Sequence, residues 1–176
     1  MIPQAPMSEK PLEERIAEVR LLVMEMEGVL TDGGEYIDGQ GSVSVRTCRA
    51  DALGLEAWRQ EGYQVVVLAR QGFKPAEAWA LAAGVDLRPH LGKKQPALQA
   101  VALEFGMQPG QVCYLGCEVD DLPAMTVVGL AAATADANPW ARGAAHLVLT
   151  RPGGAGAVRE LVDRILACRR PANQEG

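Results

Sequence analysis

Two carboxylates, Glu25 and Glu27, follow an apolar run and are separated by one residue. The run over residues 21–24 is unbroken, as is typical of a strand buried on both faces of a parallel sheet. Side chains alternate along a strand, so both carboxylates should point the same way at its carboxyl end, where open α/β sheets bind ligands. Because like charges repel each other, a cation or a shared proton should accompany the pair. The structural alternative is that two exposed glutamates merely close a strand.

A run of small residues, Gly153-Gly154-Ala155-Gly156, precedes the last segment with helical periodicity. Such a run could hold an anion at the amino terminus of the helix. A tight turn from a strand into the helix explains the same residues equally well. The sequence leaves both interpretations open.

The remaining residues that could bind a metal show no ligand pattern. The two histidines are isolated, and no second close pair of cysteines accompanies Cys113 and Cys117. This spacing does not indicate a zinc site and favours reduced thiols in a cytosol. We therefore expect His90 and His146 to be structural.

Periodicity predicts the elements that would position these residues. Apolar runs predict strands over 21–24, 64–69, 111–116, 130–133 and 146–149, with 85–91 as a strand or a connector. Helices are predicted over 51–60, 75–83, 97–105 and 157–168, with shorter helical segments over 11–17 and 139–142. Residues 36–45 alternate about glycines, which indicates a β-hairpin. Strands alternating with helices at short spacing predict an α/β fold with a single doubly wound, mostly parallel sheet.

The composition fits one globular domain. The chain has 176 residues, of which 48% are hydrophobic and 22% charged. We expect a tail and short helix over 1–17, the folded domain over 18–168 with a hairpin inserted at about 35–46, and a second tail over 169–176. A net charge of −5 argues against nucleic acid or an anionic membrane as a partner. No run is long enough to span a membrane and no signal peptide is visible, so the expected location is the cytoplasm.

Several motif residues occur in an order that identifies a family. They are Glu27-Gly28-Val29-Leu30-Thr31-Asp32-Gly33, Asp51 with Gly54-Leu55, Arg70, Lys94, Tyr114-Leu115-Gly116, Asp121, Ala135-Asp136-Ala137 and the glycine run. In this order they resemble the haloacid dehalogenase phosphatases, in the branch that contains 3-deoxy-manno-octulosonate-8-phosphate phosphatase and the similar carboxy-terminal domain of CMP-sialic acid synthetases. The resemblance implies a Rossmann-like sheet with an inserted hairpin flap and no large cap domain.

The resemblance also implies roles for individual residues. Glu25 stands where the family has the aspartate that attacks phosphorus, and Glu27 stands where it has the acid/base. Lys94 matches the family's catalytic lysine. Phosphate would be bound by the positions of Ala69, Arg70 and Lys94, although the family has a hydroxyl side chain where this chain has Ala69.

Magnesium would be held by Glu25, Glu27, Cys117, Glu118 and Asp121, of which Asp121 alone matches the family's residue type. Mg²⁺ prefers hard oxygen ligands in an octahedron, so the sulfur of Cys117 is a poor replacement. The extra methylene of Glu25 moves its oxygen by roughly a bond length, and a misplacement of about 1 Å can cost on the order of 10²-fold in rate. Ala69 removes a donor worth about 10²–10³-fold.

These departures favour a degenerate phosphatase-like protein, a pseudophosphatase that is catalytically weak or inactive and acts in oligomeric assembly or in binding a ligand or partner. It would need Mg²⁺ only if active, or no cofactor at all. The alternative is a magnesium-dependent phosphatase of a sugar-acid phosphate, of the 3-deoxy-manno-octulosonate-8-phosphate or nonulosonate-9-phosphate type, with Glu25 as nucleophile. A third hypothesis is a site that binds phosphate or sugar without turnover. The resemblance further implies a homo-tetramer formed through the 35–46 hairpin, or a separate protein partner.

Overall fold

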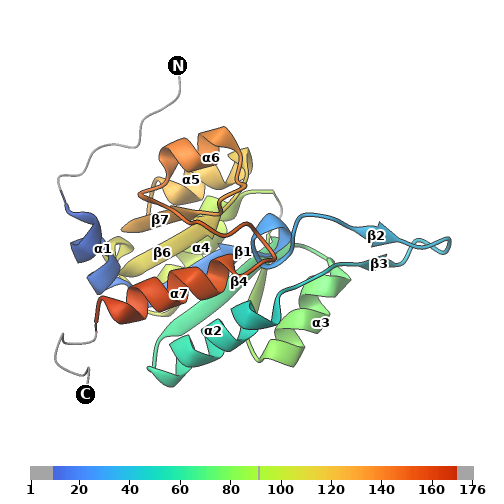
Figure 1. Ribbon diagram of the computed structural model, residues 1–176, viewed down its shortest axis with the longest axis horizontal. Helices are drawn as coiled ribbons and strands as arrows, with labels where there is room; N and C mark the ends of the chain where they lie inside the picture. Colours follow the sequence, from blue (N-terminus) through green and yellow to red (C-terminus); the bar gives the residue numbers. More distant parts are fainter. Residues whose placement is uncertain (1–9, 91, 170–176) are drawn as a thin grey trace.

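A six-stranded parallel sheet in the order β5-β4-β1-β6-β7-β8 forms the centre of the protein (Figure 1). The structure is a computed structural model that describes residues 10–90 and 92–169. The strands are β1 (Leu21–Glu25), β4 (Gln64–Arg70), β5 (Asp86–His90), β6 (Val112–Gly116), β7 (Leu130–Ala133) and β8 (Leu147–Val148). Every neighbouring pair is parallel, which confirms the predicted doubly wound α/β sheet. The parts of the predicted tails over 1–9 and 170–176 lie outside the described residues.

Burial explains why the strands are apolar runs. β1, β6 and β7 are buried along their whole length, as expected for a sheet covered on both faces. β5 lies at one edge of the sheet, where Pro89 is tolerated because one side of an edge strand has no partner. The segment over 85–91 therefore contains a strand rather than a connector.

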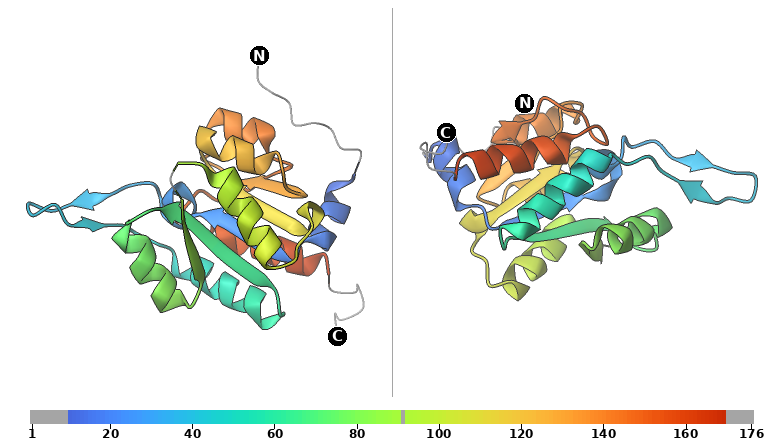
Figure 2. Two further views of the ribbon diagram at one scale, coloured as in Figure 1. Left: turned by 180° about the vertical axis from the view of Figure 1, so that it is seen from behind. Right: turned by 60° about the horizontal axis from the view of Figure 1, so that its bottom comes forward.

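Helices α2 (Arg49–Gln60) and α7 (Ala157–Ala167) pack side by side on one face of the sheet, and α4 (Lys94–Glu104) covers the other face (Figure 2). The remaining helices are α1 (Leu12–Glu18), α3 (Lys74–Ala83), α5 (Leu122–Met125) and α6 (Pro139–Ala144). No helix in the described part of the chain is long and apolar enough to cross a membrane.

Helix α4 begins three residues before the predicted start at residue 97. Pro96 lies in its first turn, where a proline is tolerated because the backbone N–H it lacks would have no partner within the helix. The earlier start makes Lys94 the first residue of the helix, and its side chain is buried in the protein.

The predicted hairpin is present as β2 (Tyr36–Ile37) and β3 (Val43–Ser44), which pair antiparallel and project from the molecule (Figure 1). The Asp38 carboxylate accepts hydrogen bonds from two backbone N–H groups across the turn. A bridge between Thr31 and Thr47 closes the base of the hairpin. The insertion is thus anchored directly after the turn that follows β1.

The glycine run before α7 packs against that same turn. The N–H of Gly154 donates to the carbonyl of Val29 at 2.9 Å, and a Cβ at Gly153 would lie 2.0 Å from the carbonyl oxygen of Gly28. The other N–H groups of the run also donate to carboxylates or carbonyls of the protein. Because these donors are occupied, the structure supports the tight turn and not the anion site.

Candidate functional site

The carboxyl edge of the sheet brings most of the predicted residues together. Glu25 is the last residue of β1, the central strand between β4 and β6. Its partner in β4 is Leu68, so Ala69 follows at the same edge, and Cys117 comes directly after the end of β6. Because the connections lead away from β1 in both directions, this is the place where an open α/β sheet binds ligands.

The turn η1 (Met26–Leu30) carries Glu27 beyond the end of the strand. Gly28 has a φ of 73°, a left-handed conformation that favours glycine, and a Cβ there would lie 2.6 Å from Cys117 Sγ. Thr31 Oγ1 accepts hydrogen bonds from two backbone N–H groups and holds the turn. The carbonyl oxygen of Glu27 consequently lies 3.4 Å from Cys117 Sγ, whose thiol donates to it.

Lys94 pairs with a carboxylate at the end of β1 and with two carboxylates after β6. Its Nζ lies 2.6 Å from Glu25 Oε1, 2.8 Å from Asp121 Oδ1 and 2.9 Å from Asp120 Oδ1. The Lys94 side chain is 0% exposed. A lysine is fully buried only when carboxylates compensate its charge, so the ion pairs explain its position.

Asp121 is bound on both of its carboxylate oxygens. Besides the Lys94 ammonium, Oδ1 accepts a hydrogen bond from the Tyr114 hydroxyl at 2.6 Å. Oδ2 accepts the backbone N–H groups of Cys117 and Glu118, each at 2.8 Å. These contacts use all four lone-pair positions of the carboxylate, so Asp121 positions the lysine and the loop after β6.

The charges of this cluster determine its protonation. Burial and the charge of Asp121 raise the pKa of Glu25 to about 9, and Lys94 does not offset this effect. Burial alone would lower the pKa of Lys94, but the carboxylates of Asp121 and Glu25 raise it. Burial would raise the pKa of Asp121, but Lys94 and backbone hydrogen bonds lower it. Lys94 and Asp121 thus favour each other's ionised form, whereas the burial of Glu25 and its proximity to Asp121 oppose the ionisation of Glu25. Lys94 is thus a cation of the kind that the sequence predicts beside the carboxylates.

Glu27 has a separate partner, Arg70 at the end of β4. Arg70 Nε lies 3.3 Å from Glu27 Oε1, and the guanidinium also pairs with Glu35 and lies over the ring of Phe73. Burial raises the pKa of Glu27. Arg70 is thus engaged by carboxylates, and a role in phosphate binding stays a prediction for it and for the adjacent, buried Ala69.

Three of the predicted metal ligands lie close together. Glu25, Cys117 and Asp121 each offer a donor atom, and these atoms lie within 4.8 Å of one another. Glu27 contributes no side chain to this group, and Glu118 is exposed and also outside it. The Oε2 atoms of Glu25 and Glu27 are buried and have no hydrogen-bond partner. A cation would satisfy such atoms, but the sulfur of Cys117 does not fit the oxygen octahedron of magnesium.

Sequence reasoning missed two members of the cluster. Asp120 pairs with Lys94, and Tyr114 donates its hydroxyl to Asp121. Asp120 was visible as part of an acidic run, and Tyr114 as the one aromatic residue in a buried strand. Neither signal reveals a partner that lies on another element.

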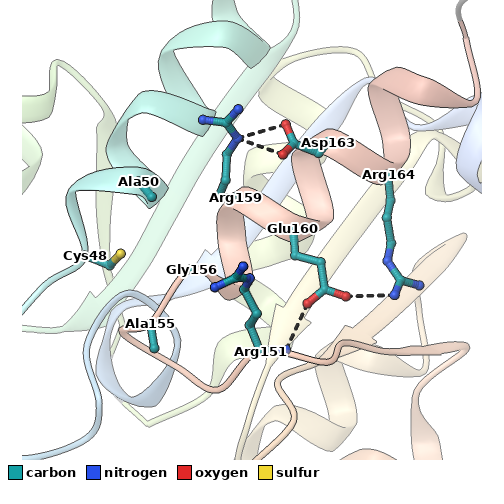
Figure 3. A pocket seen from close by; sticks show the side chains of 9 residues that line it. All are labelled: Cys48, Ala50, Arg151, Ala155, Gly156, Arg159, Glu160, Asp163 and Arg164. Carbon is teal, nitrogen blue, oxygen red and sulfur yellow. Dashed lines mark hydrogen bonds and ion pairs between the residues drawn. The ribbon is translucent and has the colours of Figure 1, made fainter.

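A hollow of about 340 Å³ lies away from this cluster, at the amino terminus of α7 (Figure 3). Its charged lining residues include Arg151, Arg159 and Arg164 together with Glu160 and Asp163. Two of the arginines are already paired on the helix, Arg159 with Asp163 and Arg164 with Glu160, each at 2.8 Å. No residue of the Glu25 cluster lines this hollow.

Comparison with known proteins shows several close similarities. The chain is 34% identical over 154 residues to the 3-deoxy-D-manno-octulosonate 8-phosphate phosphatase KdsC of Yersinia pestis, covering 87% of this chain and 82% of that protein. It is 28% identical over 159 residues to the N-acylneuraminate cytidylyltransferase A of Danio rerio, covering 89% of this chain but 37% of that protein. The cobalt-bound form of the deoxy-D-mannose-octulosonate 8-phosphate phosphatase from Haemophilus influenzae superposes with a TM-score of 0.83 at 28% identity, covering 88% of this chain and 91% of that one. No protein-family profile matches the chain.

Proposed function

Because the chain belongs to the haloacid dehalogenase superfamily, in its 3-deoxy-D-manno-octulosonate 8-phosphate phosphatase branch, we propose that it is a slow phosphatase of a sugar-acid phosphate. The observation that carries the proposal is the pairing of Glu25 with the buried Lys94 at the carboxyl edge of the sheet, at 2.6 Å. The relatives are phosphatases, which favours hydrolysis over the non-catalytic role that the departures in sequence suggest.

Glu25 is the proposed nucleophile. The ionised form of Glu25 is the reactive one: Lys94 holds its Oε1, while Oε2 has no hydrogen-bond partner and is the oxygen that would attack phosphorus. Attack forms the bond between Oε2 and phosphorus and breaks the bond between phosphorus and the sugar oxygen. Glu27, which Arg70 orients, would give its proton to the leaving oxygen and then take one from the water that releases phosphate.

The surroundings of Glu25 are acidic, and this limits the proposed reaction. Glu25, Glu27, Asp120 and Asp121 face two cationic side chains, so a phosphate dianion meets net negative charge unless a further cation binds. We therefore propose that turnover requires a divalent cation. The longer Glu25 side chain and the absence of a hydroxyl at Ala69 would each slow the reaction, which is why the proposed phosphatase is slow.

Phosphate release tests the proposal. The protein is assayed with 3-deoxy-manno-octulosonate 8-phosphate and a nonulosonate 9-phosphate, with Mg²⁺, Mn²⁺, Co²⁺ and Zn²⁺ in separate reactions. We expect slow release that Glu25→Gln abolishes, because an amide cannot act as the nucleophile. Ala69→Thr should raise the rate by up to about 10²-fold, since it restores a donor for the transferring phosphoryl group.

The matched control is Glu77→Gln on the exposed surface of α3, which should leave the rate unchanged. If neither the unaltered protein nor Ala69→Thr releases phosphate above the level of Glu25→Gln, the chain is not a phosphatase for these esters. The non-catalytic interpretation would then stand in its place.

A second candidate function is assembly. Tyr36 and Ile37 are 64% and 67% exposed on the projecting hairpin. Large apolar side chains at such a position favour an interface, so we propose that residues 35–46 join copies of this chain into a tetramer. A different protein partner on the same hairpin stays an alternative prediction. The four cysteines are free, which fits the proposed location in the cytoplasm.

A further inference from the structure

We propose that Cys117 is a metal ligand and that the site takes a thiophilic divalent transition-metal cation, of the zinc and cobalt class, in place of magnesium. The donor atoms are Cys117 Sγ, the carboxylate of Glu25 and the backbone carbonyl oxygen of Glu27. The inference concerns the same site as the proposed phosphatase and deepens that proposal. It is tested by cation binding and not by turnover, so either can fail alone.

The structure fixes the sulfur among oxygen donors. Cys117 is 6% exposed, and its Sγ packs so closely on Gly28 that a Cβ there would lie 2.6 Å away. Sγ lies 3.4 Å from the carbonyl oxygen of Glu27, and it is within 4.8 Å of a Glu25 carboxylate oxygen. Atoms at such separations can share one cation, because metal–oxygen and metal–sulfur bonds are about 2.0–2.3 Å long.

An unsatisfied atom in the same place points independently to a ligand. Glu25 is 7% exposed, and its Oε2 is buried without a hydrogen-bond partner. Oε1 is already bound by Lys94 at 2.6 Å. A buried carboxylate oxygen is rarely left unpaired, because the loss of water is uncompensated. A cation between Oε2 and Sγ would use one lone pair of this oxygen and leave the other for the proposed attack on phosphorus.

Asp121 belongs to the site as a positioning residue and not as a ligand. Its two oxygens accept four hydrogen bonds, from Lys94, Tyr114 and the N–H groups of Cys117 and Glu118. No lone-pair position is left for a metal bond. Its bond to the Cys117 N–H fixes the backbone that carries the sulfur. Three protein donors then leave positions open for water or a phosphate oxygen, as in catalytic rather than structural metal sites.

The chemistry of sulfur determines which cation fits. When the cation binds, the thiol proton that Sγ donates to Glu27 O passes to solvent, as does any proton on the Glu25 carboxyl, and the S–H bond is replaced by a metal–sulfur bond, without any oxidation or reduction. Thiolates bind zinc and cobalt well, whereas magnesium is bound through oxygen and water. The substitution that makes Cys117 a poor magnesium ligand therefore changes the preferred cation and does not abolish cation binding.

Spectroscopy and equilibrium dialysis test the inference on the metal-free, full-length protein. Titration with Co²⁺ should produce a sulfur-to-cobalt charge-transfer band in the near ultraviolet that saturates at one Co²⁺ per chain. Dialysis should show tighter binding of Zn²⁺ than of Mg²⁺. Since losing even an outer-shell partner typically weakens metal binding by about 10- to 100-fold, Cys117→Ser should weaken Zn²⁺ binding by at least about 100-fold and remove the band.

Two further variants make the test specific. Cys117→Asp should remove the band and shift the preference toward Mg²⁺, because it restores an all-oxygen donor set. Cys168→Ser, at an exposed cysteine after α7, is the matched control and should leave the band unchanged. Circular dichroism confirms that each variant is folded.

A band that persists in Cys117→Ser, or equal Mg²⁺ and Zn²⁺ affinity in the unaltered protein, would overturn the inference. Cys117 would then be a buried thiol that fills the position of a ligand. A Cys117-dependent band without phosphate release would leave the metal site standing and contradict the phosphatase. Magnesium-dependent phosphate release without the band would support the phosphatase and contradict the proposed metal site.

Discussion

Lys94 places one positive charge among the carboxylates of Glu25, Asp120 and Asp121. Its side chain is fully buried, so the ammonium has exchanged water for these partners. The carboxylates depend on it in turn, because Glu25 and Asp121 lie too close together to be ionised without compensation. At the scale of the residue, stability and the candidate chemistry thus depend on the same contact.

Removing this charge should destabilise the fold. Lys94→Met keeps the volume of the side chain but leaves buried carboxylates without their cation, which typically costs about 3–5 kcal/mol. We expect the urea midpoint of unfolding to fall accordingly. The control is Lys93→Met, one residue earlier and exposed, which should change the free energy of unfolding by less than about 0.5 kcal/mol. Equal losses in the two variants would show that the ion pairs contribute little.

Helix α7 is held to the rest of the fold by long-range hydrogen bonds to its first turns. Asp51 of α2 is 0% exposed and accepts the N–H groups of Gly156 and Arg159. Glu160 of α7 accepts the N–H and hydroxyl of Thr150 and the N–H of Arg151. The loop over residues 150–156, which packs on the turn after β1, is therefore held by Asp51 at one end and by Glu160 at the other.

The hydrogen bonds that Glu160 accepts should make the stability of the protein depend on pH. Burial alone would raise the pKa of Glu160, but hydrogen bonds from Thr150 and Arg151 and the charge of Arg164 lower it. A carboxylate whose pKa is lower in the folded state stabilises the fold above its unfolded pKa, about 4.3, and loses this effect as the pH falls through the folded value. Glu160→Gln should therefore be less stable than the unaltered protein at pH 7, and the difference should shrink below about pH 4.3.

Urea unfolding at a series of pH values from 7 downward measures this difference. Glu56→Gln, on the exposed side of α2, is the matched control. A gap between the unaltered protein and Glu160→Gln that stays constant with pH would contradict the assigned role of the carboxylate.

At the scale of the whole molecule, the hairpin is the part that projects from the core (Figure 2). It contains two short strands of two residues each, and an isolated two-stranded ribbon is only marginally stable in water. Burial of Tyr36 and Ile37 against other copies would stabilise it. Contacts between copies of the chain would therefore supply the stability that the isolated hairpin lacks.

The proposed tetramer can be tested by removing these apolar side chains. The double variant Tyr36→Ser and Ile37→Ser should give a smaller species in light scattering coupled to size-exclusion chromatography, because the apolar contact area is lost. The control is Leu103→Ser, which changes a residue that is 82% exposed on α4. If the unaltered protein is a monomer, or if the double variant keeps the mass of the unaltered protein, assembly through the hairpin is wrong.

Much of the architecture can be predicted from the sequence because its determinants are local. The apolar runs predict the central strands and the glycines predict the hairpin, whereas the sequence leaves the turn before α7 open against an anion site. The predicted start of α4 is three residues too late, because a proline such as Pro96 often precedes a helix but also fits its first turn. The site roles predicted from the sequence stay predictions, for Glu25, Glu27, Ala69, Arg70, Lys94, Cys117, Glu118 and Asp121.

The sequence by itself determined the parallel α/β sheet and the edge at which Glu25 would lie, because period and order along the chain determine both. That Lys94 and Cys117 meet it there was implied by the family resemblance. Only the tertiary structure decided which partner each group has. In the structure, Lys94 pairs with Glu25 and Asp121, and Arg70 pairs with Glu27. The N–H groups of the glycine run donate hydrogen bonds within the protein. The physical reason is that ion pairs and hydrogen bonds depend on separations of about 3 Å between distant segments, which no local pattern encodes.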